Sequence, residues 1–275
     1  VTICSSSGWA HGATSSGAKI VYCHAPARWL YQQDRYLGNH GRSLGKLALG
    51  GLKGPLRAWD RRAAASATKY VVNSSATAAM VRDAYGIEAE IVPPPPAVDA
   101  TGPVKPVEGL EPGFLLVVAR LLPYKNVDVS VHAAKATGHR LVVIGDGPER
   151  RRLEALGEGV ATFLGTVDDA TLRWCYDNCA AHIAMSHEDY GLSPLEAAAF
   201  GRPTVALRGG GYLDTVVDGV TGLHVDQPTV DSLVSSLADP RLFDLNEEVI
   251  VEHSRVFGPK RFRATMAEIV ASALS

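Results

Sequence analysis

Short runs of apolar residues alternate along this chain with longer segments that carry apolar residues at helical spacing. Such runs, bounded by turn residues, predict strands that are buried on both faces. In the second part of the sequence the runs cover residues 114–119, 141–144, 160–164, 180–185, 204–207 and 223–225. Shorter candidates in the first part cover residues 2–6, 20–23, 70–72 and 91–92. Buried strands that alternate with helices are typical of an α/β protein built on parallel sheets.

A run of consecutive prolines, residues 93–96, divides this pattern into two parts. Polyproline is stiff and cannot continue a helix or a central strand. We therefore expect one domain over residues 1–100 and a second over residues 101–255. The segment 246–274 predicts two helices, because it places four apolar residues on one face: Phe257, Phe262, Met266 and Ile269.

Residues 28–62 combine basic and apolar side chains, with eight Lys or Arg against two Asp. This mixture at near-helical spacing suits a membrane surface or a lipid-linked acceptor. The alternative is a core-facing helix with a solvated basic face. Several glycines argue against one continuous helix here: Gly45, Gly50, Gly51 and Gly54.

The composition, with 46% hydrophobic and 20% charged residues, is that of an ordinary globular protein. The net charge of −2 hides an asymmetry, since residues 1–100 hold 11 Lys or Arg against 6 Asp or Glu. The first part is therefore expected to meet something anionic. The cysteines form no disulfide or zinc pattern and predict buried thiols in a reducing cytoplasm: Cys4, Cys23, Cys175 and Cys179.

Two carboxylates, Glu188 and Glu196, stand eight positions apart after the apolar run 180–185. Ser193 and Pro194 between them predict the start of a helix. A strand end, a glycine loop and a helix N-terminus form an anion site, because free backbone N–H groups and the helix dipole face the ligand. Carboxylates beside such a site suit sugar hydroxyls, so the segment indicates a nucleotide sugar.

Ser193 and Glu196 also have a second interpretation, because Ser-x-x-Glu is a capping box that satisfies N–H groups at a helix start. This leaves Glu188 and the residues that follow other strands unexplained, which favours the functional interpretation. Those residues are Arg120, Lys125, Gly145 and Arg208. Since ligands of parallel sheets bind at the carboxyl ends of the strands, one crevice is expected to collect them.

Together these motifs resemble the retaining glycosyltransferases of family 4, which have the GT-B fold. The resemblance covers essentially the whole chain and rests on the Glu188–Glu196 spacing and on residues 117–120, 124–126, 145–148 and 208–214. Tyr22 to Leu30 resembles a segment of the mannosyltransferase-like branch. The resemblance to the family implies two Rossmann-like, doubly wound domains. It also implies that the C-terminal helix, residues 256–275, packs back toward the first domain.

The resemblance also implies a donor site that uses basic side chains and a helix N-terminus in place of a metal ion. Arg120 and Lys125 match the pair that clamps the diphosphate. Gly191 and Leu192 would offer backbone N–H groups to the distal phosphate.

The sugar and the nucleoside would be held by further positions of the same motifs. Glu188 would bind the transferred sugar and stabilise positive charge near its anomeric carbon, and Glu196 would accept hydrogen bonds from the ribose. Gly145 lies in the family's turn at the donor site, and the backbone of Val167 would contact the base.

His24 resembles the family histidine that reaches the donor sugar from the first domain. A histidine satisfied at a strand end is the alternative, but the surrounding His-Ala-Pro-Ala-Arg-Trp segment favours the family role. His11 is a weaker second candidate. Retention implies a front-face route in which the leaving phosphate takes the proton of the acceptor, which argues against a simple general base.

The resemblance thus implies a metal-independent enzyme of polysaccharide biosynthesis that moves a hexose, with mannose favoured, to a glycan or lipid-linked acceptor. A GDP- or UDP-sugar is the expected donor, with no cofactor and no nucleic-acid partner. The expected location is the cytoplasm, with peripheral membrane contact at the inner face through residues 28–62.

Two alternatives stay open at this point. One is a nucleotide-sugar 2-epimerase of the same fold. The other is a non-catalytic domain that binds a nucleotide sugar, because the first domain looks incomplete. Relative to the family, roughly three strands and a Gly-rich loop are expected ahead of Val1.

Overall fold

The computed structural model describes the backbone of residues 1–31 and 44–275, and the side chains of residues 1–31 and 52–275. Its contacts form two units. Unit 1 comprises Val1–Pro94 and Pro259–Ser275, and unit 2 comprises Pro95–Gly258. These divisions lie within a few residues of the boundaries expected at residues 100 and 255.

Unit 1 is built on a parallel sheet with the strand order β1-β2-β3-β4. The strands are β1 (Thr2–Ser6), β2 (Lys19–Cys23), β3 (Lys69–Val72) and β4 (Glu90–Ile91), close to the ranges expected from the sequence. The helical segments are η1 (Ala10–Gly12), α1 (Arg28–Tyr31), α3 (Leu44–Ala65), α4 (Ser75–Tyr85) and α12 (Pro259–Leu274).

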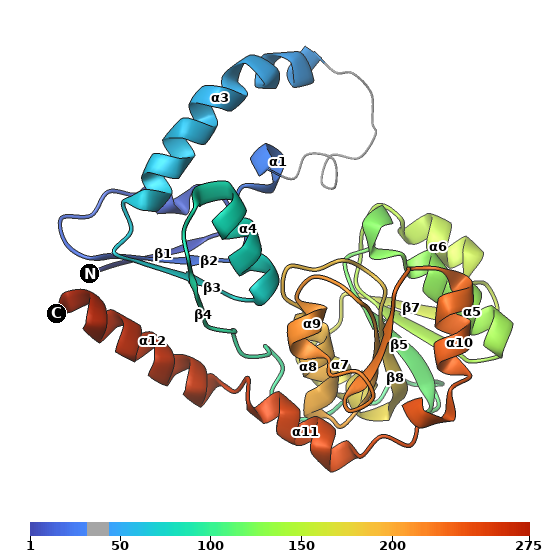
Figure 1. The fold of residues 1–275 in the computed structure, drawn as a ribbon. Coiled ribbons are helices and arrows are strands. Elements are labelled where there is room, and N and C mark those ends of the chain that lie inside the picture. Colours follow the sequence, from blue (N-terminus) through green and yellow to red (C-terminus); the bar gives the residue numbers. More distant parts are fainter. Residues whose placement is uncertain (32–43) are drawn as a thin grey trace. The chain divides into compact units, whose positions relative to one another are not determined.

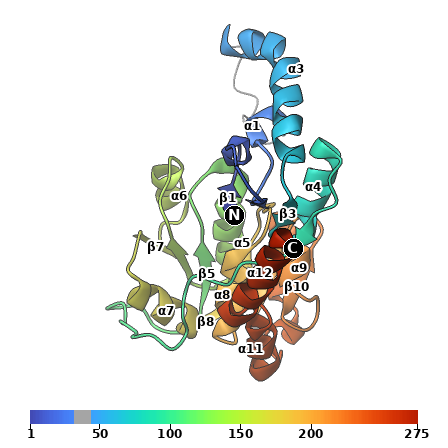
Figure 2. The same cartoon turned by 90° about the vertical axis from the view of Figure 1, so that its left-hand side faces the viewer.

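Helices cover the sheet of unit 1 on both faces, as Figures 1 and 2 show. On one face, Val21 and Val72 of the sheet pack with Ala64 of α3 and Val81 of α4. On the other face, Ile20 of β2 packs against α12. The expected pair of C-terminal helices is confirmed as α11 (Glu247–Arg255) and α12.

Helix α3 runs from Leu44 to Ala65, so the expectation that its glycines would prevent one continuous helix is wrong. Pro55 also lies inside it. Glycine and proline disfavour a helix interior by about 1 and 3 kcal/mol respectively, and packing routinely overrides such preferences. Here Trp59 lies so close to Gly12 that a Cβ atom on that glycine would come within 2.7 Å of its ring.

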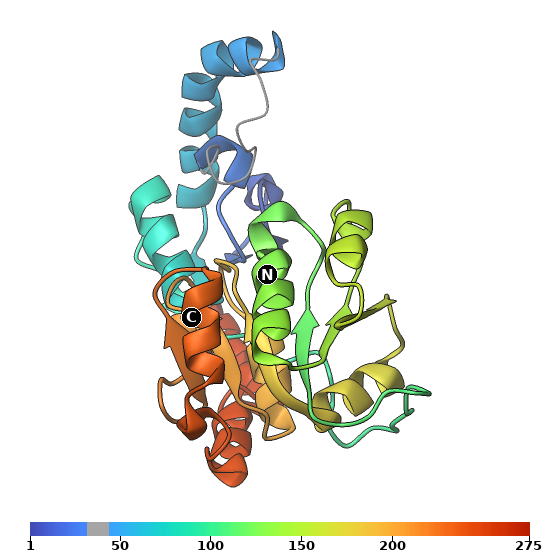
Figure 3. The same ribbon diagram turned by 90° about the vertical axis from the view of Figure 1, so that its right-hand side faces the viewer.

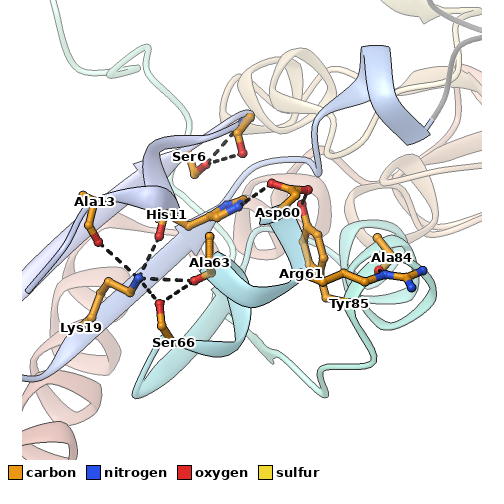
Figure 4. A network of polar contacts seen from close by, with 11 residues as sticks. Ser6, His11, Ala13, Lys19, Asp60, Arg61, Ala63, Ser66, Ala84 and Tyr85 are labelled. Atoms are coloured by element: carbon orange, nitrogen blue, oxygen red, sulfur yellow. Dashed lines mark hydrogen bonds and ion pairs between the residues drawn. The ribbon is translucent and has the colours of Figure 1, made fainter. Parts of the chain in front are cut away.

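A buried polar network also holds α3 in unit 1 (Figure 4). Asp60 of α3 and His11 of η1 are fully buried, and their side chains lie 2.7 Å apart. The hydroxyl of Tyr85 donates to the other oxygen of Asp60 at 3.0 Å. Lys19 Nζ donates to the backbone oxygen of His11 at 2.8 Å. His11 is therefore a core residue, and the expectation that it reaches a donor sugar is wrong because its side chain is fully buried.

Unit 2 is built on a parallel sheet with the strand order β10-β9-β8-β5-β6-β7. Its strands are β5 (Phe114–Val118), β6 (Leu141–Ile144), β7 (Ala161–Gly165), β8 (Cys179–Ala184), β9 (Thr204–Leu207) and β10 (Gly222–Val225). Each coincides with an apolar run of the sequence to within two residues. These strands are nearly continuous runs of apolar residues because both faces are buried.

Helices cover both faces of this sheet as well. They are α5 (Val127–Thr137), α6 (Arg150–Leu156), α7 (Asp169–Asn178), α8 (Leu192–Ala199), α9 (Tyr212–Thr215), α10 (Val230–Leu237) and α11, with the short turns η2 (Pro123–Lys125) and η3 (Pro240–Leu242). Helices α5 and α10 lie side by side on one face (Figure 3), where Val131 and Leu233 join the core. Helices α7 and α8 pack on the other face through Tyr176 and Ala197.

The order of strands in unit 2 reverses direction between β5 and β8. From β5 the chain adds β6 and β7 on one side, then crosses to add β8, β9 and β10 on the other. In open parallel sheets, ligands bind in the crevice outside the carboxyl ends of the strands at such a switch point. The loops that follow β5 and β8 are therefore where a site is expected.

The four cysteines are buried thiols outside any disulfide, as expected from their spacing. Burial raises the pKa of Cys175 and of Cys179 to about 12 in each case, which makes both thiols unreactive at neutral pH. Among the helices that the structure describes, none is both long and apolar enough to cross a bilayer.

Candidate active site

The loops after β5 and β8 meet through an ion pair at the switch point. Lys125 Nζ, at the end of η2, donates to Glu188 Oε1 at 2.6 Å. The side chains are 14% and 23% exposed, so the pair is shielded but open to solvent. Asn126, in the left-handed conformation at φ 52°, donates from Nδ2 to the backbone oxygen of Met185 at 2.8 Å. Two side-chain hydrogen bonds from the loop after β5 thus fix it to the loop after β8.

The Glu188 carboxylate has a second anchor on its own loop. Ser186 Oγ donates to the same oxygen, Oε1, at 2.7 Å. The hydroxyl of Tyr212, at the start of α9, lies 3.1 Å from Ser186 Oγ. Neither residue was predicted to belong to the site, although Ser186 directly follows the apolar run 180–185 and Tyr212 lies in the 208–214 motif.

Glycines bring the 208–214 segment against the Glu188 loop. The backbone N–H of Gly211 donates to the backbone oxygen of Glu188 at 2.8 Å. A Cβ atom on Gly210 would come within 2.1 Å of that same oxygen, and one on Gly211 within 2.1 Å of the backbone oxygen of Tyr190. The consecutive glycines of this motif are therefore needed for close backbone approach.

Arg208, which was expected in the same crevice, pairs with one aspartate on each side of β10. Its Nε donates to Asp226 and its Nη2 to Asp218, each at 2.8 Å. Asp218 also accepts the backbone N–H of His224. Arg208 thus fastens the loop before β10 to the end of β9.

The turn at Gly145 supports the segment that carries Arg120. The backbone N–H of Leu121 donates to the oxygen of Asp146 at 2.9 Å. At φ 124°, a Cβ atom on Gly145 would lie 2.0 Å from the backbone oxygen of Ala119, so only glycine fits. Arg120 itself is exposed at this edge. A direct contact of Gly145 with a donor stays a prediction.

Helix α8 begins beside the Glu188 loop, and its N-cap is Gly191 at φ 112°. No side chain caps this end, so the capping-box interpretation of Ser193 and Glu196 is wrong. A Cβ atom on Gly191 would come within 2.7 Å of the ring of Tyr212, which leaves room for glycine alone. Because no side chain occupies this end, its N–H groups are available to an anion, as the role predicted for Gly191 and Leu192 requires.

Glu196 faces inward instead of capping the helix. It is 7% exposed, and Oε2 accepts the hydroxyl of Tyr176 at 2.8 Å. Burial raises the pKa of Glu196, while hydrogen bonds from Tyr176 and from the backbone of Ala97 act in the opposite direction. The predicted contact of Glu196 with a ribose is compatible with its remaining acceptor capacity and stays a prediction.

The raised pKa of Glu196 predicts a pH-dependent contribution to stability. Its ordinary value is 4.5, so above that pH the unfolded chain releases the proton while the folded chain still holds it. The contribution is fully present below 4.5 and is lost as the pH rises through the folded pKa. We expect the free energy of unfolding of the wild type, relative to Glu196→Gln, to fall across this window in urea titrations. A difference that does not vary with pH would contradict this.

Two further predicted residues are His24 in unit 1 and Val167 in unit 2. His24, in unit 1, follows β2, and its Nε2 lies 2.9 Å from Ser5 Oγ. Partial burial lowers the pKa of His24, which favours the neutral imidazole. Val167, after β7, is partly buried against the cluster that contains Phe114 and Tyr176. The roles of both residues stay predictions.

Metal ligands do not gather in this site. Within the described parts of the chain, no three His, Cys, Asp or Glu side chains are arranged as metal ligands would be.

Comparison with protein families gives a match over residues 103–239, described as glycosyl transferases group 1. This span includes Arg120, Lys125, Gly145, Glu188 and Glu196. The match to the glycosyl transferases group 1 family thus covers just under half of this chain.

Among curated proteins, D-inositol 3-phosphate glycosyltransferase of Acidothermus cellulolyticus is 33% identical over 195 residues, which cover 59% of this chain and 43% of that protein. The GDP-mannose-dependent alpha-(1-6)-phosphatidylinositol monomannoside mannosyltransferase of Mycolicibacterium smegmatis is 31% identical over 153 residues, which cover 46% of this chain and 39% of that protein. The chain therefore spans less than half the length of these two relatives.

Solved structures agree on the fold. Sucrose-phosphate synthase from Thermosynechococcus elongatus superimposes with a TM-score of 0.78 at 20% identity, covering 98% of this chain and 73% of that one. Anabaena HepE in complex with UDP superimposes with a TM-score of 0.73 at 16% identity, covering 93% of this chain and 72% of that one. The predicted fold class is confirmed as GT-B with two Rossmann-like domains on parallel sheets.

Proposed function

We propose that this chain carries the donor site of a glycosyltransferase that moves a hexose from a nucleotide diphosphate sugar to a glycan or lipid-linked acceptor. The observation that carries the proposal is the Lys125–Glu188 pair at the switch point of unit 2, beside the uncapped start of α8. A cation and free N–H groups suit a diphosphate, and a carboxylate suits sugar hydroxyls. The match of residues 103–239 to the glycosyl transferases group 1 family supports the same proposal.

GDP-mannose is the first donor to test. Tyr22 to Leu30 and the 208–214 segment resemble the mannosyltransferase-like branch, and the Mycolicibacterium smegmatis relative is named as GDP-mannose-dependent. The Anabaena HepE structure holds UDP, which makes UDP-sugars the second class to test.

In the proposed reaction, Arg120 and Lys125 neutralise the diphosphate as the bond between the anomeric carbon and the phosphate oxygen breaks. The acceptor oxygen attacks the same face of the sugar, which retains its configuration, and its proton passes to the leaving phosphate. Glu188 stabilises the positive charge that develops on the sugar. Glu196 holds the ribose, the backbone of Val167 contacts the base, and His24 of unit 1 binds the donor sugar.

The acceptor is proposed to approach along unit 1. Helix α3 carries Lys53, Arg57, Arg61 and Arg62 beside the exposed Leu52 and Trp59. Basic and apolar groups together suit the surface of an anionic membrane, and hence a lipid-linked acceptor at the inner face of the cytoplasmic membrane. The part of residues 28–62 between 32 and 43 lies outside the described residues.

Because basic side chains and a helix N-terminus take the place of a cation, donor binding and transfer are expected to survive excess EDTA. The experiment incubates the protein with labelled GDP-mannose or UDP-glucose and a glycan or lipid-linked acceptor, with EDTA or with Mg²⁺, and identifies products by mass spectrometry. A glycosylated acceptor in both conditions supports the proposal. A strict requirement for Mg²⁺ contradicts the metal-independent scheme, and an epimerised sugar without transfer favours a 2-epimerase.

A further inference from the structure

We propose that Ser186 and Tyr212 are positioning residues that hold the Glu188 carboxylate toward the donor sugar when Lys125 turns to the diphosphate. This inference rests on the proposed function. It concerns how the site passes from the arrangement in which Lys125 and Glu188 bind each other to one in which each binds a different part of the donor.

The hydrogen-bond chain has a fixed direction. Ser186 has one hydroxyl proton, and it is given to Glu188 Oε1 at 2.7 Å. The 3.1 Å contact between Ser186 and Tyr212 must then use the proton of Tyr212, with Ser186 Oγ as acceptor. Burial, and after it the charge of Glu188, raises the pKa of Tyr212, so the phenol stays protonated and can donate.

Burial makes this chain of contacts hard to rearrange. Ser186 is 4% exposed and Tyr212 is 3% exposed, so neither hydroxyl can exchange its partner for bulk water. The ring of Tyr212 is held in place, because it lies against Gly191 so closely that a Cβ atom there would come within 2.7 Å. Buried hydroxyls that lose their partner are costly, which favours one arrangement of the chain.

Lys125 is placed differently from these two residues. It is joined to Glu188 through the same oxygen, Oε1, but it lies on the loop after β5 and keeps 14% of its side chain exposed. It also lies over the ring of Tyr124, with Nζ 5.2 Å from the centroid. A diphosphate competes with Glu188 for this ammonium group. When Lys125 turns to the phosphates, the Ser186–Tyr212 chain is the remaining contact at Oε1 among the described residues. Oε2 can then accept a hydrogen bond from a sugar hydroxyl.

The two hydroxyls should therefore matter for the sugar part of the donor and not for the diphosphate part. Titration calorimetry would measure the dissociation constants of GDP and GDP-mannose, and of UDP and UDP-glucose, for the wild type, Ser186→Ala and Tyr212→Phe. We expect Ser186→Ala, which removes a hydrogen bond to a charged group, to lose about 10-fold in affinity for the nucleotide sugar. Tyr212→Phe removes a hydrogen bond between neutral groups and should lose about 5-fold. Affinity for the matching diphosphate should stay within about 2-fold, because Lys125 remains.

Ser186→Thr is the matched control, since it keeps the hydroxyl and should retain the wild-type ratio of the two dissociation constants. Tyr212→Phe keeps the ring against Gly191, so loss of packing does not confuse the result. An unchanged ratio in both variants, or equal losses for sugar and diphosphate, would overturn the inference while the proposed function stands. If the wild type binds neither ligand, the proposed function fails, and the inference fails with it.

Discussion

Replacing Lys125 by alanine is expected to weaken the binding of UDP or GDP by about 1.5–3 kcal/mol, which is about 10- to 150-fold. The ammonium group is shielded on both sides by its own loop and the Glu188 loop, so its interaction with a phosphate is only partly screened by water. Its partner Glu188 would also be left unpaired beside the diphosphate. Both effects weaken the binding of the diphosphate.

Titration calorimetry with the diphosphates and with uridine or guanosine alone would measure this loss. Lys135→Ala removes an exposed lysine from α5 in the same unit and should leave both affinities unchanged. Glu188→Gln added to Lys125→Ala should recover part of the diphosphate affinity, because it removes the unpaired negative charge. Equal losses for the nucleoside and the diphosphate would show that Lys125 does not clamp phosphates.

Asp60→Ala is expected to destabilise unit 1 by roughly 2–4 kcal/mol, because it leaves one buried and one partly buried donor unpaired, at about 1–3 kcal/mol for the buried one and less for the other. His11 lies 2.7 Å from one oxygen of Asp60, and Tyr85 donates to the other at 3.0 Å (Figure 4). Because His11 and Asp60 are fully buried, water cannot replace their bond without opening the contact between α3 and η1. A loss of this size is a large share of the stability of a typical domain.

Urea unfolding of unit 1 can be followed through its aromatic cluster. Trp9 lies 4.6 Å from Trp29 and 5.4 Å from Trp59 between ring centroids, while Trp174 belongs to unit 2. Near-ultraviolet circular dichroism of these rings reports on the packing of α3. Asp83→Ala, on the exposed face of α4, is the control and should change stability by no more than about 0.5 kcal/mol. A loss for Asp60→Ala no larger than this control would contradict the structural role of the network.

The strands of unit 2 could be predicted from the sequence because parallel strands buried on both faces must be nearly continuous apolar runs. Residues 114–118 and 141–144 are examples, and the structure reproduces them almost residue for residue. Helix α3 could not be predicted, because its glycines oppose a helix and the contacts that outweigh them come from Gly12 and His11, far away in the sequence.

The candidate site could be predicted in part. The residues after β5 and β8 were expected at one crevice, because parallel strands end at one edge, and the structure joins Lys125 to Glu188 there. The start of α8 was harder, since Ser193 resembles a cap while Gly191 is the true N-cap. The burial of His11 and the anchoring of Glu188 by Tyr212 depend on packing between distant segments, which no local pattern reports.

The most direct measurement for the central claim is a titration of the wild-type protein in EDTA with GDP, UDP, GDP-mannose and UDP-glucose. The account predicts that at least one matched pair of diphosphate and nucleotide sugar binds at a single site, and that chelation leaves the affinity unchanged. Absence of heat and of thermal stabilisation with all four ligands at millimolar concentration would contradict the assignment of Lys125 and Glu188 to a nucleotide-sugar site.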